Sequence, residues 1–536
     1  MSESEFDYIV VGAGSAGCAI ASRLSEDENC RVCLIEGGVS DDTPRVQIPS
    51  GLLTLQRSEY YSYQYKSVPQ GHLNDREIPS PRGRVLGGSS SMNSMVYIRG
   101  HASDYDKWEA MGCAGWGYKD VLPFFKFSEH NMLGQESEYH GTEGELFVDR
   151  PRQPNVFSRM FVEAGKSLQL PENTDFNGAK LEGVGIYNVT QKDGRRCSSY
   201  RAFIHPVRHR KNLTLLVGWS VEKLTVDGLA VTGVSIARAG ERVHLKSRCE
   251  TILSAGAYGS PEILMKSGVG DAEELRAVGI DPVHDLPAVG KNLQDHLDCV
   301  TTYRCADHRS LGVSWRALPQ IVTAPLRYFG WKRGWMTTNY VEAGGFAKTR
   351  YADDVPDVQF HFVPAYRSVR GRLLETGHGF AVHTCVLRPR SRGRVSLVNS
   401  DRGPQLRIDF NFLADEHDGK VLIEGLRLAR RILSAPPLSE VTGQEIGPGA
   451  DKTTDDQLLA YVRELARTVY HPSGTCRMGI GNDCVVRPDL TVYGMERLRV
   501  ADASVMPLLV SGNTNAPSIM IGERCAHFIR SNRSPH

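Results

Sequence analysis

The first forty residues constrain the fold most strongly, because they join a strand, a glycine-rich turn, a helix and a second strand in one run. Short β-branched segments are typical of buried parallel strands, and repeated small and apolar residues at helical period indicate a helix. In chain order the elements are YIVV (8–11), the GxGxxG glycines Gly12, Gly14 and Gly17, CAIASRL (18–24), and RVCLIE (31–36). This order predicts a dinucleotide-binding βαβ unit.

The segment contains a residue for each role that dinucleotide binding requires. Gly12 permits the tight turn, Gly14 lets the backbone approach a pyrophosphate, and Gly17 lets helix and strand pack closely. The N-terminus of the helix supplies free N–H groups and partial positive charge to phosphates. Glu36 can accept hydrogens from both ribose hydroxyls and would repel a 2′-phosphate, so NADP is disfavoured. This motif alone does not separate FAD from NAD.

Length and composition are ordinary for a soluble globular protein. The chain has 536 residues, enough for two to four domain-sized units or one large enzyme with an embedded second domain. Its net charge of +1 gives no reason to expect nucleic acid as a partner, and the basic run PVRHRKNL (206–213) is interpreted as a solvated loop. The sequence contains no apolar run of about 18 residues, so a membrane-spanning helix is not predicted.

Cysteine usage and the N-terminus favour a cytoplasmic protein. The start, MSESEF, is acidic and leads directly into a strand pattern, unlike a secretory signal. The twelve cysteines are scattered, and we expect mostly buried free thiols. Cys30 and Cys33 form a CxxC that flanks a strand, without a second pair to complete a zinc site. Peripheral association with a membrane, and a homo-oligomer, are both compatible with the sequence.

A second notable segment lies near the C-terminus, where YHPSGTCRMG (470–479) brings a histidine, a cysteine and an arginine together. Taken alone, the segment fits a Cys-His nucleophile pair, half of a metal site, or a histidine that does acid-base chemistry for another group. Nothing within the segment decides between these three.

Residues 82–100, RGRVLGGSSSMNSMVYIRG, form a Gly/Ser-rich loop that alternates small and apolar residues. With the N-terminal unit, the chain resembles the glucose-methanol-choline family of FAD oxidoreductases, and within it the choline dehydrogenase-like bacterial branch of alcohol dehydrogenases and oxidases. The similar segments run in order along nearly the whole chain: SAGAYGSPEILMKSGVG (254–270), EYHGTEGEL, GRRCSSYRAF, VGKNLQDH, TTNYVEAGGFAKT, PDVQFHFVPA, YHPSGTCRMG and VADASVMPLLVSGNTNAPSIMIGERCA.

The resemblance implies an α/β fold with a Rossmann-like FAD-binding domain and an α+β substrate domain on an antiparallel sheet. The FAD domain would be discontinuous, formed by residues 1–160, 206–300 and 455–536, with 161–205 and 301–454 in the substrate domain. Local patterns agree, since NLTLLVG and CETILSAG are typical of strands, and GRVSLVNSD and PQLRIDFNF of paired hairpin strands.

The resemblance also assigns the site. His471 aligns with the catalytic histidine of the family, a base that takes the hydroxyl proton while flavin N5 takes the hydride. Asn515, counted back from Gly522, is taken as the second catalytic residue, with Asn513 as the rival. Asn515, Ala516 and Pro517 also predict the start of a helix to about Ile529, aimed at the flavin. Besides Gly12, Gly14, Gly17 and Glu36, the implied cofactor contacts are Ser15, Ala16, Gly87, Gly88, Asn93, Met95, Val96, Val221, Ala255, Asp502, Ala503, Asn515 and Pro517.

Two positions limit the chemistry further. Some members of the family tether FAD through a histidine in the Gly/Ser loop, but the aligned residue here is Met92, so we expect noncovalent FAD. Cys476 is expected to be a buried structural thiol rather than a nucleophile, and no metal site is expected.

The predicted function is FAD-dependent oxidation of a primary alcohol to an aldehyde, with a quinone, a dye or oxygen as electron acceptor. The alternative is a lyase on the same fold, either a hydroxynitrile lyase or a light-driven fatty acid decarboxylase. The alcohol is left open between choline, aliphatic, aryl and polyether substrates. A choline site needs an aromatic cage and a carboxylate, for which Tyr60, Tyr61, Tyr63, Tyr65 and Glu342 are available.

Overall fold

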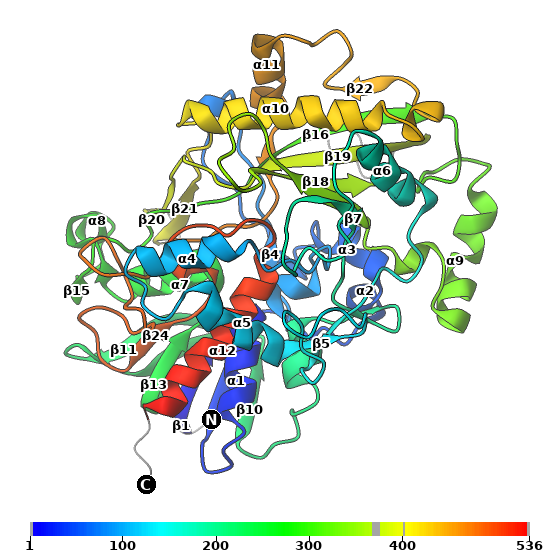
Figure 1. Ribbon diagram of the computed structural model, residues 1–536. Coiled ribbons are helices and arrows are strands. Elements are labelled where there is room, and N and C mark those ends of the chain that lie inside the picture. The colour runs from blue at the N-terminus through cyan, green and yellow to red at the C-terminus, as the bar shows by residue number, and fades with distance from the viewer. Residues whose placement is uncertain (1–3, 367–375, 400–402, 533–536) are drawn as a thin grey trace.

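Two large sheets organise the chain in the computed structural model, which describes residues 4–366, 376–399 and 403–532 (Figure 1). In the first sheet, β1 lies between β2 and β13 and is parallel to both, β10 and β24 continue the parallel part, and β11 and β12 add an antiparallel edge. Its strands are β10 (Leu213–Val217), β2 (Val32–Glu36), β1 (Ser4–Val11), β13 (Glu241–Leu253), β12 (Ala230–Arg238), β11 (Ser220–Asp227) and β24 (Leu498–Val500).

Two helices from opposite ends of the chain pack side by side against this sheet. They are α1 (Ser15–Leu24), which follows β1, and α12 (Asn515–Ser531), which ends the described chain (Figure 1). Nearly all of α1 and most of α12 is buried, as expected for helices packed between a sheet and a neighbour. The ion pair between Arg23 and Glu523, at 2.8 Å, joins them inside this layer. The predicted strand–turn–helix–strand unit and the predicted final helix are therefore confirmed.

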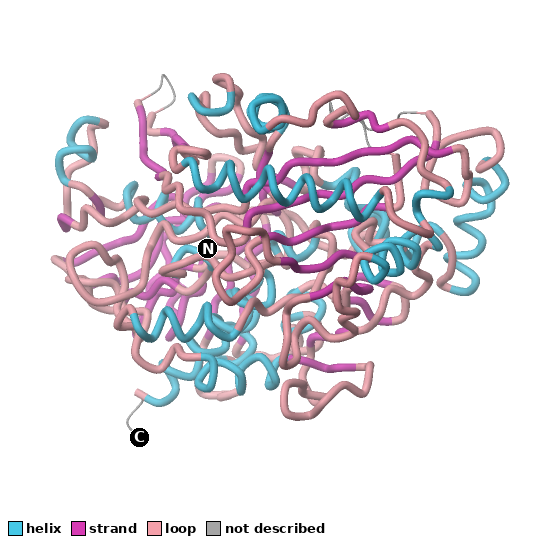
Figure 2. The backbone as a smooth tube through the Cα atoms, turned by 45° about the horizontal axis from the view of Figure 1, so that its top comes forward, coloured by secondary structure: helices cyan, strands magenta, loops and turns pink. Residues whose placement is uncertain are grey.

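The second sheet is antiparallel throughout and lies above the first. Its central strands are buried on both faces, since α10 (Glu416–Leu433) and α6 (Val156–Ser167) cover the outer side (Figures 1 and 2). Its strands are β22 (Glu445–Gly447), β16 (Leu297–Cys305), β19 (His378–Val386), β18 (Val358–Val363), β17 (Ala343–Ala347), β7 (Gly183–Ile186) and β23 (Arg467–Thr468). The predicted fold class, a Rossmann-like unit with an antiparallel second sheet, is confirmed.

The two sheets have largely separate hydrophobic cores. One core surrounds β1, β2, β13 and α12, and the other surrounds β16, β18, β19 and α10. Two strands of the second sheet include residues that the sequence analysis assigns to the FAD domain. The strand β16 begins at Leu297, and β23 places Arg467–Thr468 on the second sheet. The approximate division into two discontinuous domains stays a prediction.

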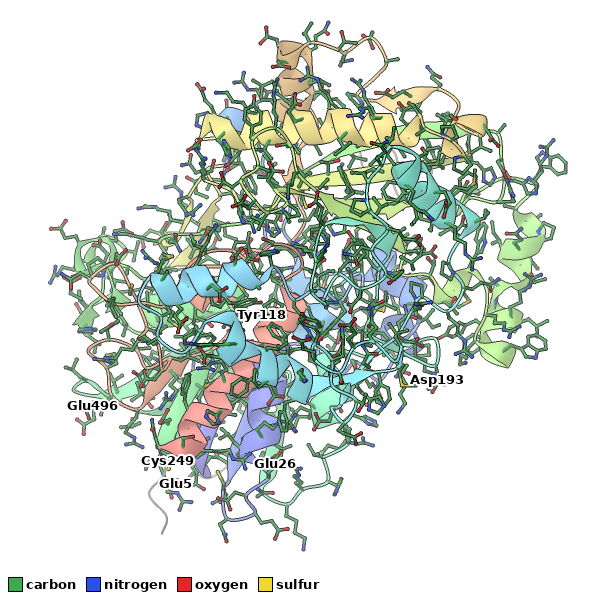
Figure 3. The ribbon with its side chains drawn as sticks, viewed as in Figure 1. Glu5, Glu26, Tyr118, Asp193, Cys249 and Glu496 are labelled. Carbon is green, nitrogen blue, oxygen red and sulfur yellow. The ribbon has the colours of Figure 1, made fainter. Side chains whose placement is uncertain are left out.

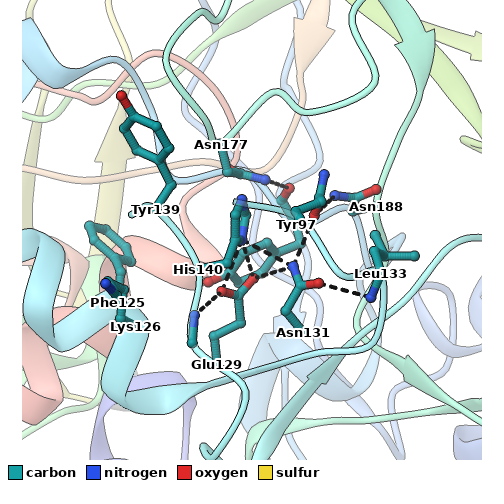
Figure 4. Close-up of polar contacts among 12 residues, drawn as sticks. Tyr97, Phe125, Lys126, Glu129, Asn131, Leu133, Tyr139, His140, Asn177 and Asn188 are labelled. Atoms are coloured by element: carbon teal, nitrogen blue, oxygen red, sulfur yellow. Dashed lines mark hydrogen bonds and ion pairs between the residues drawn. The ribbon is translucent and has the colours of Figure 1, made fainter. Parts of the chain in front are cut away.

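A buried polar network fixes the chain beside the Gly/Ser loop (Figure 4). Glu129 accepts from Arg99 at 2.7 Å and contacts Nδ1 of His140 at 3.0 Å, and the other ring nitrogen of His140 lies 2.9 Å from Asp175. Asn177 donates to the carbonyl of Tyr97, so this network reaches the segment directly after the loop. Because buried ionic groups are paired and hydrogen-bonded here, the segment around Tyr97 has a defined path.

The remaining elements connect these layers. The hairpin predicted from GRVSLVNSD and PQLRIDFNF is confirmed as the antiparallel pair β20 (Arg394–Val398) and β21 (Gln405–Asp409), while residues 400–402 lie outside the described residues. The other helices are α2 (Pro44–Gln47), α3 (Leu52–Leu55), α4 (Ala102–Ala110), α5 (Tyr118–Ser128), α7 (Gly256–Lys266), α8 (Ala272–Ala277), α9 (Leu318–Trp331) and α11 (Asp455–Leu465). The short strand pairs are β3 (Ser62–Tyr63) with β4 (Arg82–Gly83), β5 (Glu129–Asn131) with β6 (Leu146–Val148), β8 (Gln191–Lys192) with β9 (Arg195–Arg196), and β14 (Val269–Gly270) with β15 (His284–Asp285).

The cysteines are free thiols, as expected, and all are buried except Cys249 and Cys305. This includes Cys30 and Cys33 of the CxxC, where Cys33 belongs to the core strand β2. Among the described residues, no group of three His, Cys, Asp or Glu side chains is arranged to hold a metal ion.

Candidate active site

One long cavity, with a volume of about 540 Å³, runs between the two sheets. It begins at the turn between β1 and α1 and ends at the histidine of the YHPSGTCRMG segment. Its size lies in the range usual for cofactor and substrate sites. The predicted site residues that line it are Gly12, Gly14, Ser15, Ala16, Glu36, Gly88, Asn93, Met95, Val96, Val221, Ala255, Asp502, Ala503, His471 and Asn515. Gly17, Gly87 and Pro517 lie behind this wall.

The glycine turn has the shape that the sequence predicts. Gly12 has a φ of +99°, and a Cβ atom there would meet the carbonyl oxygen of Ser254 at 2.6 Å. A Cβ atom on Gly17 would overlap the carbonyl oxygen of Gly12, so the helix approaches the strand as closely as glycine allows. No side chain caps the N-terminus of α1, where Gly14 is the N-cap residue. The free N–H groups of this helix end can therefore bind an anion in the cavity.

Glu36 lies at the end of β2 and forms the wall of the cavity beside this turn. Its two carboxylate oxygens accept from the backbone N–H groups of Ala13, at 3.1 Å, and Gly38, at 2.8 Å. Burial raises the pKa of Glu36 to about 7, and the two backbone hydrogen bonds oppose that shift. Each oxygen keeps a lone pair for a further donor, as a ribose hydroxyl requires.

The Gly/Ser loop is held by the GRRCSSYRAF segment. Arg196 is buried and donates to the carbonyl oxygens of Ser90 and Asn93 and to the side chain of Asn93. The Asn93 side chain also accepts from the backbone N–H of Met95, at 2.9 Å. A buried guanidinium that satisfies several carbonyls at once fixes the backbone firmly, so Asn93, Met95 and Val96 form a preorganised wall.

His471 lines one end of the cavity, and hydrogen bonds to the backbone of Tyr470 and His471 fix its position. Its N–H donates to Asp295 at 2.9 Å, and Arg82 donates twice to the carbonyl of Tyr470, at 3.0 Å. Tyr470 has a φ of +71°, a conformation that a residue with a bulky side chain adopts only when its surroundings impose it. The carboxylate of Asp295 also accepts from Thr468. These contacts fix the position of the His471 backbone, from which the imidazole extends.

The ring contacts of His471 define its tautomer. Nε2 of His296 lies 3.1 Å from the carbonyl oxygen of Leu387, which can only accept, so this nitrogen carries a hydrogen. Burial lowers the pKa of His296 to about 3, so its other nitrogen, Nδ1, is bare. That nitrogen lies 3.0 Å from Nδ1 of His471, which must then be the donor.

The same reasoning leaves the lone pair of His471 on Nε2 as a hydrogen-bond acceptor, and the Nδ2 atom of Asn513 faces it at 3.2 Å. Burial, and then the neighbouring imidazoles of His296 and His361 and the charge of Arg82, lowers the pKa of His471 well below its usual range. A neutral His471 with its hydrogen on Nδ1 presents Nε2 as an acceptor to the cavity. This is the state that a general base needs.

The structure gives the two candidate asparagines of the second catalytic position different partners. Asn513, not Asn515, lies beside His471, with its Nδ2 atom 3.2 Å from Nε2 of His471. Gln359 donates to Oδ1 of Asn513 at 3.2 Å and so orients the amide. Asn515 is instead the first residue of α12, and its Oδ1 accepts from Ser15 at 2.8 Å, which joins the N-termini of α12 and α1. Asn513 belongs to the turn at residues 511–514 and Asn515 begins the helix, so the two side chains have different partners, and which of them is catalytic stays a prediction.

The second sheet supplies a polar wall opposite the cofactor turn. Asp298 of β16, His361 of β18 and His383 of β19 all line the cavity, and His361 and His383 are direct partners across the two strands. Asp298 and His383 are 2.7 Å apart. Within the described chain, Oδ1 of Asp298 and Nε2 of His361 are buried without a hydrogen-bond partner. Unsatisfied buried polar atoms in a cavity wall indicate where a ligand binds.

The residues considered for a choline cage are not assembled at His471. Glu342 is buried away from the cavity wall, where it accepts from Ser158, Thr338 and the backbone N–H of Asn155 at the start of α6. Tyr63 and Tyr65 do line the cavity, but the hydroxyl of Tyr63 lies beside Gly37, next to Glu36. Tyr60 is exposed and Tyr61 packs in a separate small core.

Met92 and Cys476 lie where the sequence analysis expects. Met92 lines the cavity and packs against Val46, Leu55, Tyr61 and Val85, with no group that could bond to a flavin. Cys476 is buried and free, it lies outside the cavity wall, and burial raises the pKa of its thiol well above the usual range. A thiol in that state is a poor nucleophile.

Several residues of the site were not identified from the sequence. His361 and His383 are polar residues inside otherwise apolar strand segments, VQFHFV and FAVHTCV, and such interruptions are a usable signal. Asp298 and His296 stand at the start of β16 in the segment QDHLD. No local pattern indicates that His296 contacts His471, or that the other three residues line the same cavity, because these positions lie far apart in the chain.

Comparisons with known proteins agree with this geometry. Sequence profiles of the GMC oxidoreductase family match residues 6–298 and 389–522. An alcohol dehydrogenase [acceptor] of Pseudomonas putida is 45% identical over 526 residues, covering 98% of this chain and 95% of its own. An oxygen-dependent choline dehydrogenase of Rhizobium rhizogenes is 41% identical, covering 99% and 97%. The crystal structure of pyridoxine 4-oxidase from Mesorbium loti has a TM-score of 0.89 and 30% identity, covering 99% and 100%. The chain belongs to the GMC oxidoreductase family and is a flavin-dependent oxidoreductase.

The residues of the cavity fit FAD, the cofactor of this family. The turn at Gly14 offers uncapped N–H groups for a pyrophosphate, and Glu36 offers lone pairs for a ribose. The far end of the cavity is closed by the rigid loop at Asn93–Val96 and by the N-terminus of α12. The donor set therefore suits a long anionic dinucleotide.

Proposed function

We propose that this protein oxidises a primary alcohol to an aldehyde with bound FAD, and that His471 is the base. When bound, FAD supplies the acceptor for the hydrogen that leaves the carbon with two electrons. The observation that carries the proposal is the array Leu387–His296–His471–Asn513. It leaves the Nε2 lone pair of a neutral imidazole in the cavity.

The protein's own groups account for the proton. When substrate binds, its hydroxyl replaces the Asn513 amide as the donor to Nε2 of His471. The amide N–H of Asn513 then donates to the same substrate oxygen as negative charge develops there. We assign the second catalytic role to Asn513 instead of Asn515, because only Asn513 contacts His471. Once protonated, His471 keeps its donor bond to His296, so the ring does not rotate during the reaction.

The polar wall of the second sheet orients the substrate. Asp298 and His361 each offer an unsatisfied atom on the side of the cavity across from the cofactor turn. These atoms would bind the polar groups of the alcohol and so orient its hydroxyl toward His471.

We infer noncovalent binding of FAD, because Met92 stands in the Gly/Ser loop where a tethering histidine would be needed. Acid denaturation followed by centrifugation should leave the yellow colour in the supernatant. Colour retained on the precipitated polypeptide would overturn this inference.

We also propose a division into domains near residues 161, 206, 300 and 455. The electron acceptor is proposed to be a quinone, a dye or oxygen, and the location is proposed to be cytoplasmic. The location is supported by the buried free thiols alone. The similar proteins are named as dehydrogenases and an oxidase, which favours alcohol oxidation over the lyase alternative.

A panel of alcohols tests the function. Purified holoprotein is mixed without oxygen with primary aliphatic, aryl, polyether and choline substrates, and the flavin absorbance is followed by stopped flow. At least one class should bleach the flavin at a rate that saturates with concentration. Absence of bleaching with every class would contradict the proposal. Admission of air to the reduced protein then separates an oxidase from a dehydrogenase.

A further inference from the structure

The helix α9 (Leu318–Trp331) exposes apolar side chains along the face that turns away from the protein. It lies at the edge of the molecule, and Figure 3 shows side chains projecting outward along it (Figures 1 and 3). Within and just before this helix, large apolar side chains are between 55% and 79% exposed: Trp315, Leu318, Val322, Leu326, Phe329 and Trp331. We call these six residues the α9 surface.

The outward face is not needed to hold the helix in place. The inward stripe consists of Ala317, Ala324 and Tyr328, which are buried, and the hydroxyl of Tyr328 donates to the carbonyl of Gly194 at 3.1 Å. A surface helix normally places charged residues opposite such a stripe. Here Arg327 is the single charged residue in the helix. Large contiguous apolar patches are rare on soluble monomers and indicate a binding surface.

The charge around the α9 surface identifies the kind of partner. Residues 311–336 contain Arg316, Arg327, Lys332 and Arg333 and no acidic residue, whereas the whole chain has a net charge of only +1. Two of these side chains stack on aromatic rings, Arg316 over Trp315 at 5.2 Å and Lys332 over Tyr328 at 4.5 Å. Tryptophan, apolar and basic side chains together are typical of segments that lie in a bilayer interface and bind anionic lipids.

The helix is too short to cross a bilayer, but its length suits a helix that lies in the plane of the interface. With 14 residues it is about 21 Å long, shorter than the roughly 30 Å of a hydrocarbon core. Among the described residues, no helix is long and apolar enough to span a membrane.

The α9 surface is also continuous with the cavity wall. The chain leaves α9 through a 3₁₀ turn, Trp335–Thr337, which contacts the turn Pro49–Gly51, and then reaches Tyr340 and Val341, which line the cavity. The hydroxyl of Tyr340 donates to the carbonyl of Ser50 at 3.4 Å, directly before the lining residues Leu52 and Leu53. A partner bound at α9 therefore sits beside one side of the cavity.

We propose that the α9 surface docks this protein peripherally on an anionic lipid bilayer, with the six apolar side chains in the interface and the four basic residues at the headgroups. This membrane docking is independent of the proposed alcohol oxidation. It also identifies the side of the molecule from which a lipid-soluble alcohol or electron acceptor would approach.

Vesicle sedimentation tests the proposal with the FAD-loaded protein. Vesicles of equal parts phosphatidylglycerol and phosphatidylcholine should pellet the protein, pure phosphatidylcholine vesicles should pellet at least tenfold less, and added salt should release it. The double variant Leu326→Glu/Phe329→Glu should lose at least tenfold in bound fraction. Ile480→Glu is the matched control, since Ile480 is an equally exposed apolar residue elsewhere, 64% exposed, and should bind like the natural protein.

A second variant separates loss of binding from loss of fold. Leu326→Gln/Phe329→Gln adds no charge and should also bind weakly, while both double variants keep the natural melting temperature and reduce flavin with alcohol at the natural rate. Absence of pelleting by anionic vesicles, or equal pelleting of the double variants and the natural protein, would overturn the proposal. A stable dimer in solution that the double variants convert to monomer would also overturn it, because the surface would then bind a second copy of the chain.

Discussion

The Nδ1 atoms of His296 and His471 lie 3.0 Å apart, and the contact of His296 with the Leu387 carbonyl makes His471 the donor of the pair. A histidine that donates from Nδ1 has its basic lone pair on Nε2, facing the cavity and Asn513. His296 is thus a positioning residue that acts on the reaction through His471.

Replacing His296 separates its hydrogen bond from its bulk. His296→Leu removes the acceptor for Nδ1–H, so the rate of anaerobic flavin reduction should fall, by less than the roughly 10²- to 10⁴-fold contribution of the base itself. His296→Asn places an amide oxygen near the position of Nδ1 and should restore most of the rate. If the flavin is reduced at the same rate in the two variants, the contact with His296 does not set the tautomer of His471.

Asn513 and Asn515 should have different phenotypes. Asn513→Ala removes the donor beside Nε2 of His471, and flavin reduction should slow by about 10²- to 10³-fold, as for the loss of one such donor in other sites. Asn515→Ala removes the bond to Ser15 and should weaken FAD retention, while the flavin that stays bound is reduced at nearly the natural rate. Stopped-flow absorbance and the flavin-to-protein ratio measure the two effects. The reverse pattern would return the catalytic role to Asn515.

The pH dependence of flavin reduction reports the state of His471. The base acts in its neutral form, and burial lowers its pKa well below the ordinary value of about 6.5. The reduction rate should therefore stay level as pH falls through 6.5 and decline only at lower pH, where His471 takes a proton before the substrate arrives. A rate that drops about tenfold per pH unit directly below 6.5 would show an unperturbed histidine.

Glu36 should control FAD affinity and its pH dependence. The ionised carboxylate is the form that accepts from ribose hydroxyls, and burial raises its pKa to about 7, so FAD should bind more weakly as pH falls below 7. Glu36→Gln should weaken binding by about 10- to 100-fold at pH 8, the range for a hydrogen bond to a charged group, and remove the pH dependence. Fluorescence titration of apoprotein measures both. Glu342→Gln, a buried carboxyl outside the cavity wall, is the control and should bind FAD normally.

The sequence predicts the cofactor half of the site better than the substrate half, for a physical reason. Gly12, Gly17 and Glu36 lie within one βαβ unit, where local chain geometry determines the phosphate turn and the ribose contact. The polar wall depends on the pairing of β16, β18 and β19, which brings Asp298, His361 and His383 together from positions far apart in the chain.

The two candidate asparagines of the second catalytic position could not be distinguished from the sequence for a similar reason. Asn513 and Asn515 are two residues apart in a turn, and only the tertiary contacts with Gln359 and His471 on one side, and Ser15 on the other, distinguish them. Glu342 shows the opposite case, a carboxyl that looked available for a substrate but is used to hold the start of α6.

The most direct test of the account is flavin reduction by His471→Ala. The variant should fold, bind FAD with the natural stoichiometry, and still be reduced by dithionite, since His471 contributes no contact to the turn at Gly14 or to Glu36. With a saturating primary alcohol and no oxygen, its flavin should be reduced about 10²- to 10⁴-fold more slowly than in the natural protein. Reduction at nearly the natural rate would contradict His471 as the base.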